Sequence, residues 1–340
     1  MEMRSLGRTG LKVSALCLGA MMFGEWGTAD RAECVRMMSR AFDAGVNFVD
    51  TADVYSHGES EQIVGEALRH RRDEIVLATK VHGPMSADPN SRGNSRRWIM
   101  RACEDSLKRL NTDWIDLYQL HRPDPTCDID ETLGALSDLV HSGKVRYVGT
   151  STFPASDIVE AQWVAQRHGH VRFVCEQPPY SMLARGIEAE VLPVLERHKM
   201  GAITWSPLAG GWLSGRYRAG TAAPASTRAA RVPQRYDLEN PLNVAKLEVT
   251  EQLAKLAEGH GISLVHMAIG FVIAHRAVSS AIIGPRTMEH LETQIGAADE
   301  PLGAELLDAI DVIVPPGATI NPVDAGYVMP ALVDPSNRRR

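Results

Sequence analysis

Eight short runs rich in leucine, β-branched and aromatic residues recur along the chain, and their spacing restricts the fold more than any other feature. The runs are ALCLG from Ala15, NFVD from Asn47, IVLATK from Ile75, IDLYQL from Ile115, VRYVGT from Val145, RFVCE from Arg172, GAITW from Gly201 and SSAII from Ser279. The first seven begin 27 to 40 residues apart. This interval is close to the length of one strand-and-helix unit.

Stretches with the apolar spacing of a helix fill the intervals between these runs. They cover residues 32–44, 97–110, 132–140, 158–165 and 191–195. Alternation of strand and helix predicts a parallel sheet, and eight such units predict a (β/α)8 TIM barrel of the α/β class. A doubly wound open sheet is the competing topology. Its dinucleotide-binding form carries G-x-G-x-x-G after the first strand, and LCLGAMMFGEWG, which begins at Leu16, does not supply that motif.

Three segments fall outside the eightfold pattern, which otherwise predicts a single barrel domain over residues 1–340. The starts of the last two runs lie 78 residues apart, and most of the surplus, at 213–241, is rich in Ala, Arg, Pro and Thr. It predicts a flexible loop insertion that is either a lid or a tolerated surface segment. Residues 2–13, around GRTG, predict an N-terminal hairpin. The Pro-rich stretch 315–340 predicts an irregular C-terminal tail.

The composition is that of an ordinary globular protein and excludes several classes. Hydrophobic residues make up 44% and charged residues 23% of the chain, and the net charge is only −6, with basic residues spread along the sequence. We therefore expect no nucleic-acid surface. The longest apolar stretch, 264–274, is too short to span a membrane and predicts a buried helix. Five widely spaced cysteines without CxxC, and no export signal at the N-terminus, favour a cytoplasmic protein with reduced thiols.

Four ionisable residues stand at or just after the carboxyl ends of three neighbouring predicted strands. Asp50 ends the second strand and Tyr55 follows it, Lys80 ends the third strand, and His121 follows the fourth. Singly, each residue is explained as a turn former, a rim charge or half-buried packing. Their convergence on the face where (β/α)8 enzymes carry their chemistry favours a catalytic site.

These four residue types suit the protonation of a carbonyl oxygen. The phenol of Tyr55 holds its proton at neutral pH, but it is a weak acid unless a nearby cation such as Lys80 stabilises the phenolate. Asp50 would keep Lys80 charged and oriented, and His121 would position the carbonyl oxygen by a hydrogen bond. An alternative reading takes Lys80 as a Schiff-base lysine in an aldolase-like barrel.

Eight separated stretches resemble motifs of the aldo-keto reductase family, in the family's order, over residues 5 to about 297. They are GRTGLKVSALCLG, GVNFVDTADVY, LATK, DLYQLHRPD, GKVRYVGTST, EQPPYSM, WSPLAGGWLSG and AIIGPRTMEHLETQI. The chain is most similar to the branch that contains bacterial soluble reductases and the β subunits of voltage-gated potassium channels. The resemblance implies a catalytic tetrad of Asp50, Tyr55, Lys80 and His121, and a nicotinamide cofactor, NADP(H), bound without a Rossmann fold.

The resemblance also implies which residues contact the nicotinamide and pyrophosphate of that cofactor. They are Ser151, Thr152, Gln177, Trp205, Ser206, Leu208 and Gly210. Residues 151, 152 and 177 would hold the carboxamide, although Asn is commoner in the family where this chain has Thr152. Trp205 would stack on the nicotinamide ring. Glycine in the turn that follows lets backbone amides approach a pyrophosphate closely.

The segment GPRTMEHLETQI is expected to bind the adenosine end of the cofactor. It begins with Gly284 in a turn that opens a helix, and Arg286 adds a planar cation suited to a 2′-phosphate. By resemblance, His290 and Gln294, four residues apart on one helical face, would flank the phosphate or the adenine. An ordinary helix cap at Thr287 is the structural alternative for this segment.

The leading functional hypothesis is NADPH-dependent reduction of an aldehyde or ketone, with a small carbonyl compound as substrate and no nucleic-acid or membrane partner. The alternative is a cofactor-binding, redox-sensing regulatory protein with slow turnover. Trp26, Met85 and Trp98 are candidates either for an apolar substrate pocket or for packing. His168 and His170 lack further ligands at metal spacing in the sequence, so we expect a solvated turn there and no metal site.

Overall fold

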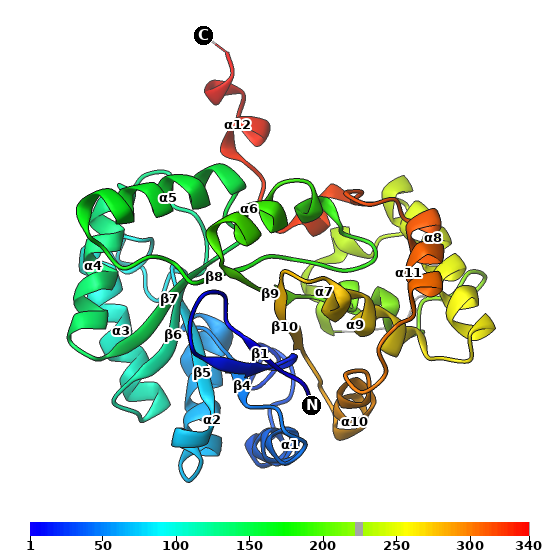
Figure 1. The fold of residues 1–340 in the computed structure, drawn as a ribbon, viewed down its shortest axis with the longest axis horizontal. Coiled ribbons are helices and arrows are strands. Elements are labelled where there is room, and N and C mark those ends of the chain that lie inside the picture. Colours follow the sequence, from blue (N-terminus) through cyan, green and yellow to red (C-terminus); the bar gives the residue numbers. More distant parts are fainter. Residues whose placement is uncertain (222–226, 340) are drawn as a thin grey trace.

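Eight parallel strands close into a barrel at the centre of the molecule (Figure 1). The computed structural model describes residues 1–221 and 227–339. The barrel strands are β3 (Leu16–Gly19), β4 (Phe48–Asp50), β5 (Val76–Val81), β6 (Ile115–Leu120), β7 (Val145–Ser151), β8 (Cys175–Gln177), β9 (Gly201–Trp205) and β10 (Val278–Ile283). Each strand pairs with the next along the chain, and β10 pairs with β3 to close the ring. The predicted (β/α)8 barrel is confirmed.

Helices surround the barrel on its outside (Figure 1). The longer ones are α1 (Arg31–Asp43), α2 (Glu59–Leu68), α3 (Arg96–Leu110), α4 (Ile129–His141), α5 (Ala155–His168), α6 (Val191–His198), α8 (Pro241–Gly259), α9 (Leu264–Ala274), α10 (Met288–Gly296) and α11 (Ala304–Ile313). The short ones are α7 (Thr227–Arg231), α12 (Pro330–Val333), and the 3-10 turns η1 (Tyr55–Gly58), η2 (Arg72–Glu74), η3 (Gly186–Glu188), η4 (Ala209–Ser214), η5 (Pro233–Arg235), η6 (Pro322–Ala325) and η7 (Pro335–Asn337). Asp30, Ser95 and Asp128 begin α1, α3 and α4 as N-caps, because their side chains accept a hydrogen bond from the first turn.

Successive residues of each strand point alternately into the barrel and toward the helices, because the side-chain period of a strand is two. In β4, Phe48 belongs to the interior cluster and Val49 to the outer core. In β5, Ala78 belongs to the interior cluster. Two residues further along each strand, Asp50 and Lys80 therefore point into the barrel at its carboxyl end. The barrel interior is therefore apolar along most of its length and ionic at the carboxyl end of the strands.

The N-terminal hairpin closes the opposite end of the barrel. It is formed by β1 (Met3–Ser5) and β2 (Lys12–Ser14), as predicted, and its Leu6 and Val13 side chains are fully buried in the interior cluster. Gly7, with φ 55°, lies where a Cβ would come within 2.6 Å of the Val174 carbonyl oxygen and 2.8 Å of the Gly201 nitrogen. These atoms mark the amino ends of β8 and β9, so the hairpin packs tightly against the end away from Asp50 and Lys80.

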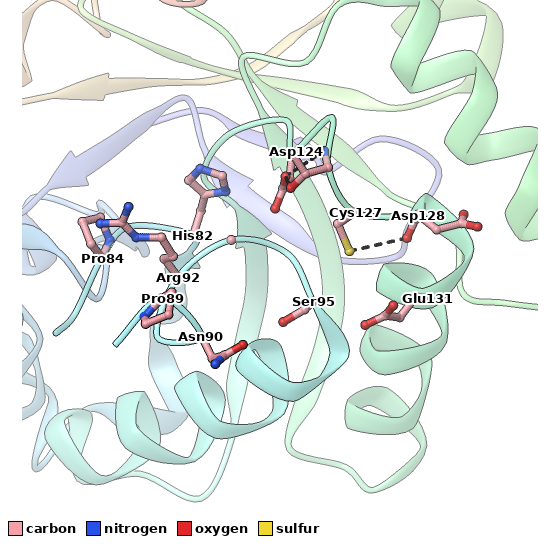
Figure 2. A pocket seen from close by; sticks show the side chains of 12 residues that line it. His82, Pro84, Pro89, Asn90, Arg92, Ser95, Asp124, Cys127, Asp128 and Glu131 are labelled. Atoms are coloured by element: carbon pink, nitrogen blue, oxygen red, sulfur yellow. Dashed lines mark hydrogen bonds between the residues drawn. The ribbon is translucent and has the colours of Figure 1, made fainter. Parts of the chain in front are cut away.

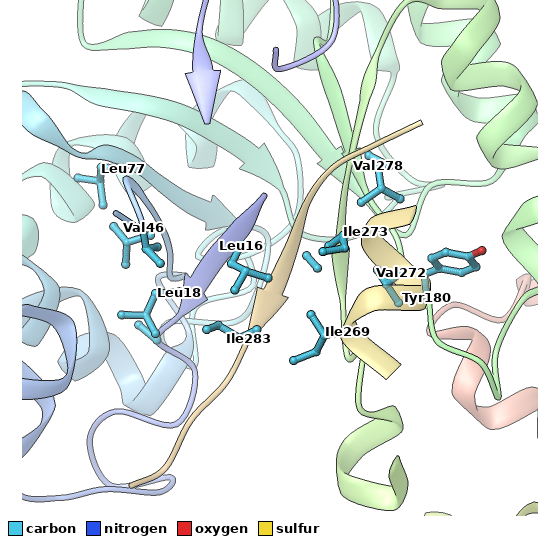
Figure 3. Close-up of a cluster of buried hydrophobic side chains, with 14 of the residues drawn as sticks. Leu16, Leu18, Val46, Leu77, Tyr180, Ile269, Val272, Ile273, Val278 and Ile283 are labelled. Carbon is cyan, nitrogen blue, oxygen red and sulfur yellow. The ribbon is translucent and has the colours of Figure 1, made fainter. Parts of the chain in front are cut away.

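The outer core lies between the strands and the helices. Figure 3 shows part of it, where Leu16 and Leu18 of β3 and Ile283 of β10 face Ile269 and Ile273 of α9. This packing explains why 264–274 is apolar, since nearly all of α9 is buried against the barrel. Among the described residues, no single helix is both long and apolar enough to cross a membrane; α8 and α9 meet the test only as a pair bent by 96°.

Most element boundaries agree with the sequence pattern, and the differences have local causes. The sixth strand begins at Cys175 and not at Arg172. Helix α8 was not expected, because the buried face of its first half is polar and includes Asn243, Lys246 and Thr250. An apolar periodicity is therefore absent where the helix begins.

The predicted insertion and tail contact each other. The 213–241 insertion contains α7 and η5, while residues 222–226 lie outside the described part of the chain. Tyr236, at the end of the insertion, stacks on Trp212 with ring centroids 6.0 Å apart and donates to the Gly210 carbonyl oxygen at 2.8 Å. In the tail, Asp324 is buried between Arg235 Nε at 2.9 Å and Lys246 Nζ at 2.7 Å. The last residues, from α12 onward, extend away from the barrel (Figure 1). Flexibility of the insertion stays a prediction.

Candidate active site

A buried ion pair lies at the carboxyl end of β4 and β5. Lys80 is fully buried and Asp50 is 3% exposed, and Lys80 Nζ donates to Asp50 Oδ1. Lys80 also donates to the Thr51 carbonyl oxygen at 2.9 Å and to the Tyr55 hydroxyl at 3.3 Å. One ammonium group thus joins two of the predicted site residues to each other, and its three hydrogens have three partners.

Tyr55 is held by an unusual piece of backbone. It follows β4 in the 3-10 turn η1, where Ser56 has φ 46° and His57 has φ 54°. Left-handed conformations are unfavourable for residues with a Cβ, so neighbouring contacts must stabilise this turn. One such contact is made by the Ser56 hydroxyl, which accepts a hydrogen bond from the backbone N–H of Trp26 at 3.2 Å. The turn brings the half-buried Tyr55 ring within 4.9 Å of Lys80 Nζ.

Two glutamines complete the surroundings of Asp50. Its second oxygen accepts from Gln119 Nε2 at 3.1 Å and from Gln177 Nε2 at 2.9 Å. Gln177 Nε2 also lies 3.2 Å from Gln119 Oε1. The carboxylate is therefore fixed on both oxygens and can serve only as an acceptor, which suits a group whose task is to hold a cation.

The electrostatic surroundings keep Lys80 charged. Burial by itself would lower the pKa of the Lys80 ammonium, but the Asp50 carboxylate, with a further contribution from Tyr55, outweighs burial and the net shift of the pKa is upward. A Schiff-base lysine must instead lose its proton to act as a nucleophile. The Asp50 ion pair therefore argues against the aldolase-like alternative.

His121 is the fourth residue of the predicted tetrad and lies next to Tyr55. Its ring lies 5.6 Å from the Tyr55 ring, edge to face at 81°. Burial, reinforced by the charges of Lys80 and Arg122, lowers the pKa of His121 well below its ordinary value. The imidazole is therefore neutral at physiological pH, and one of its nitrogens can donate a hydrogen bond. All four residues predicted for the tetrad meet at this end of the barrel.

The residues expected at the nicotinamide lie on the next strands. Ser151 ends β7 and donates to the Gln177 carbonyl oxygen at 2.9 Å, while the Thr152 hydroxyl donates to the Ser151 carbonyl oxygen at 2.7 Å. Each hydroxyl oxygen can still accept a hydrogen bond from an amide. Trp205 ends β9 and remains partly exposed. Gly326 of the tail lies against it, since a Cβ there would be 2.9 Å from Trp205 Cζ2.

The turn after β9 is shaped by left-handed residues. Ser206 has φ 63° and Gly210 has φ 71°, and the Ser206 hydroxyl accepts from the Gly210 N–H at 2.9 Å. A Cβ on Gly211 would meet nothing within 4 Å. Leu208 is the residue before η4. The turn is therefore open to a ligand at Gly211, as a pyrophosphate contact requires.

His290, in the first turn of α10, lies in the positive electrostatic field of two arginines. Burial and the charges of Arg286 and Arg216 lower the pKa of His290. A Cβ on Gly284 would meet nothing within 4 Å, and Gln294 Oε1 is buried with no hydrogen-bond partner among the described residues. The positive field of two arginines, an open glycine turn and an unpaired amide oxygen fit an adenosine phosphate, whose phosphate accepts hydrogen bonds and whose adenine amino group donates one. The residues present thus fit NADP(H).

Trp26 lies at the mouth of the barrel above the tetrad. Its ring is 6.0 Å from the Tyr55 ring, and the Arg231 guanidinium carbon of the insertion lies 4.2 Å from its centroid. Trp98, by contrast, is 3% exposed and belongs to the outer core, and Met85 packs against that core. Of the three candidates for a substrate pocket, only Trp26 reaches the site.

A separate pocket of about 570 Å³ lies beside the loops that follow β5 and β6 (Figure 2). Its lining residues are His82, Pro84, Pro89, Asn90, Arg92, Gly93, Ser95, Asp124, Thr126, Cys127, Asp128 and Glu131. The tetrad does not contribute to this lining. The pocket is therefore not the space in which Tyr55 would meet a carbonyl group.

Sequence reasoning missed three residues that take part in this arrangement. Gln119 stands on β6 two positions before His121, so strand alternation could have identified it as inward pointing. Arg216 follows the β9 turn in a segment without periodicity, and no sequence signal connects it to Arg286. Arg231 lies in the insertion, and its contact with Trp26 depends on the path of that loop.

Glu176, next to Gln177, faces away from the site and accepts a hydrogen bond from the Phe153 backbone N–H at 3.2 Å.

Comparison with known proteins agrees with this geometry. The model of the Aldo/keto reductase family matches residues 15–315. "Uncharacterized oxidoreductase YrpG" of Bacillus subtilis is 40% identical over 327 residues, which cover 93% of this chain and 96% of that protein. "Probable voltage-gated potassium channel subunit beta" of Arabidopsis thaliana is 37% identical over 92% of this chain and 97% of that protein. A "Putative voltage-gated potassium channel subunit beta" of Schizosaccharomyces pombe is 34% identical over 92% of both chains.

The family match covers the whole barrel, from the first strand to the end of the last barrel helices. It agrees with the barrel topology. The chain belongs to the aldo/keto reductase family and is an oxidoreductase.

Proposed function

We propose that the protein reduces an aldehyde or ketone to an alcohol, with NADPH as the hydride donor and Tyr55 as the proton donor. The observation that carries this proposal is the position of Lys80 Nζ, which contacts both Asp50 and the Tyr55 hydroxyl. An ammonium group in this position can stabilise the phenolate that forms when Tyr55 gives up its proton.

Each residue of the tetrad has one task in this reaction. The substrate carbonyl oxygen accepts a hydrogen bond from the Tyr55 hydroxyl and another from the neutral His121 imidazole. Bound NADPH supplies a hydride to the carbonyl carbon. The C=O π bond opens, the oxygen takes the Tyr55 proton, and Lys80 stabilises the resulting phenolate until solvent returns a proton. Asp50 holds Lys80 in position throughout.

Binding of the cofactor is assigned to the residues that fit it. Ser151, Thr152 and Gln177 would hold the carboxamide, and Trp205 would lie against the nicotinamide ring. The turn that contains Ser206, Leu208 and Gly210 would approach the pyrophosphate. At the other end, Gly284, Arg286, His290 and Gln294 would bind the adenosine 2′-phosphate, with Arg216 as an additional cation.

The test is consumption of NADPH with an activated aromatic aldehyde by the parent protein and by Tyr55→Phe. Loss of the general acid should lower kcat by about 10²- to 10⁴-fold, while NADPH binding, followed by quenching of tryptophan fluorescence, stays intact. Tyr118→Phe is the matched control. It removes the same oxygen from a fully buried tyrosine on the outer side of β6, whose hydroxyl has no partner among the described residues. Activity retained by the Tyr55 variant would refute the role of Tyr55.

The phosphate assignment is tested separately by comparing NADPH with NADH. Arg286→Met removes a charge-assisted hydrogen-bond donor, an interaction of about 1.5–3 kcal/mol. We expect the KM for NADPH to rise about 10-fold or more, with little change for NADH. Equal losses for both cofactors would contradict the 2′-phosphate contact.

A second candidate function is supported by the relatives named as potassium channel β subunits. In this alternative the protein is a redox-sensing regulatory protein that retains its cofactor and turns over slowly. It would elute from gel filtration with NADPH bound and reduce every carbonyl compound slowly, and a stable protein partner would copurify with it. Rapid multiple turnover with a simple aldehyde would exclude it.

A further inference from the structure

Two histidines at and just after the end of α5 meet an aspartate of α4 on the surface. His168 is the last residue of α5, and Gly169 follows it with φ 75°, the left-handed conformation that glycine adopts readily. The chain turns there and brings the His170 ring to 6.1 Å from the His168 ring. Asp130, in the first turn of α4, lies between them.

One carboxylate oxygen faces a nitrogen of each ring. Asp130 Oδ1 lies 2.6 Å from His168 Nδ1 and 2.9 Å from His170 Nε2. The three ligand atoms all lie within 4.8 Å of one another. In a tetrahedral zinc site, bonds of about 2.0–2.1 Å separate the ligand atoms by about 3.3 Å. A metal ion would therefore require only small movements of three side chains that are all partly exposed.

We propose that Asp130, His168 and His170 form a binding site for a zinc-like divalent transition-metal ion. The donor set determines the class of ion, because imidazole nitrogens favour Zn²⁺ and its neighbours over Mg²⁺ and Ca²⁺, which prefer oxygen ligands. Three protein ligands leave one coordination position for water. Each imidazole would present to the metal the nitrogen that now faces Asp130, with its ring proton on the other nitrogen.

This site differs from the sequence expectation of a solvated turn for a definite reason. Asp130 precedes His168 by 38 residues and His170 by 40. Only the packing of α4 beside α5 joins the carboxylate to the histidines. The bound metal would link the first turn of α4 to the end of α5, and it would stabilise the folded chain by mass action, because the unfolded chain does not hold the three ligands together.

The test measures zinc binding to the tag-free full-length protein after dialysis against a chelator. Competition with a chromophoric zinc indicator should give one ion per chain with a dissociation constant in the micromolar range, and zinc should raise the thermal unfolding temperature. His168→Gln, His170→Gln and Asp130→Asn should each weaken binding at least about tenfold and abolish the thermal shift. Circular dichroism checks that the variants are folded.

Two control variants separate this site from other possible ligands. His198→Gln changes a histidine that also ends a helix before a left-handed residue, but in α6. Cys127→Ser removes a partly buried thiol that lines the pocket of Figure 2 together with His82. Both should bind zinc like the parent protein. The proposal is overturned if the parent binds no zinc at about 100 µM, an affinity below about 5.5 kcal/mol, or if the His168 variant binds it unchanged.

Discussion

Asp53, a buried carboxyl group in the loop that carries Tyr55, allows a direct test of how burial changes the pKa of a side chain near the active site. It lies between β4 and Tyr55, is fully buried, and neither of its carboxylate oxygens has a well-formed hydrogen bond among the described residues. Burial, with a further contribution from the Glu61 carboxylate, raises the pKa of Asp53 to about 8, while the Val54 amide, Arg109 and Lys80 oppose the shift only in part. At neutral pH the folded protein therefore carries a protonated Asp53.

The sign of the pH dependence follows from this pKa. In the unfolded chain an aspartate titrates near 3.9, so between about pH 4 and pH 8 the folded state binds the extra proton. Stability then falls as the pH rises through this window, by up to about 1.4 kcal/mol per pH unit. Between pH 5 and pH 8 the contribution of Asp53 amounts to about 4 kcal/mol. Tyr118, whose hydroxyl feels the charge of Asp53, stays neutral throughout because burial raises its pKa.

Asp53→Asn removes the ionisation with little change of shape. The free energy of unfolding of the variant minus that of the parent should be about 4 kcal/mol larger at pH 8 than at pH 5. For 340 residues the unfolding entropy is about 0.7 kcal/mol per kelvin, so this gain corresponds to roughly 5 °C in Tm. The assay is thermal unfolding of both proteins at pH 5, 6, 7 and 8 in buffers of matched ionic strength.

Asp73→Asn, at an exposed position of η2, controls for the general effect of removing one negative charge. Its Tm difference from the parent should be small and nearly independent of pH. If the Tm of the Asp53 variant and of the parent decline in parallel from pH 5 to pH 8, Asp53 is ionised in the folded protein, and the argument from its burial is wrong.

Three further predictions concern the ion pairs and the core. Lys80→Met should lower kcat by at least about 10²-fold with NADPH binding preserved, and a variant that keeps parental kcat would contradict the role of the ammonium group. Asp324→Asn leaves Arg235 and Lys246 without their buried partner and should lower the free energy of unfolding by about 3–5 kcal/mol, measured by urea denaturation; an unchanged midpoint would mean that the tail is not anchored there. Leu16→Ala in the outer core should destabilise by about 2–5 kcal/mol, and kcat measured well below its lowered Tm should stay parental.

Local pattern carried most of the information about the barrel. The first seven strands alternate with helices at intervals of 27 to 40 residues, and a period of two along β4 and β5 places the apolar side chains and then Asp50 and Lys80 on the inner face. Because strands of a parallel barrel end on the same side, residues at successive strand ends meet without any knowledge of the loops. His121 could be predicted for the same reason. Tyr55 follows in a turn whose left-handed residues no sequence pattern indicates.

The sequence by itself therefore determined the architecture and the residue types at the barrel mouth, since both depend on spacing along the chain. Only the tertiary structure decided which residues meet across long separations: Gln119 and Gln177 on one oxygen of Asp50, and Asp130 between two histidines. These contacts depend on the packing of neighbouring strands and helices and on the paths of irregular loops. Such contacts leave no periodic signal in the sequence, because the residues that form them are not separated by any regular spacing along the chain.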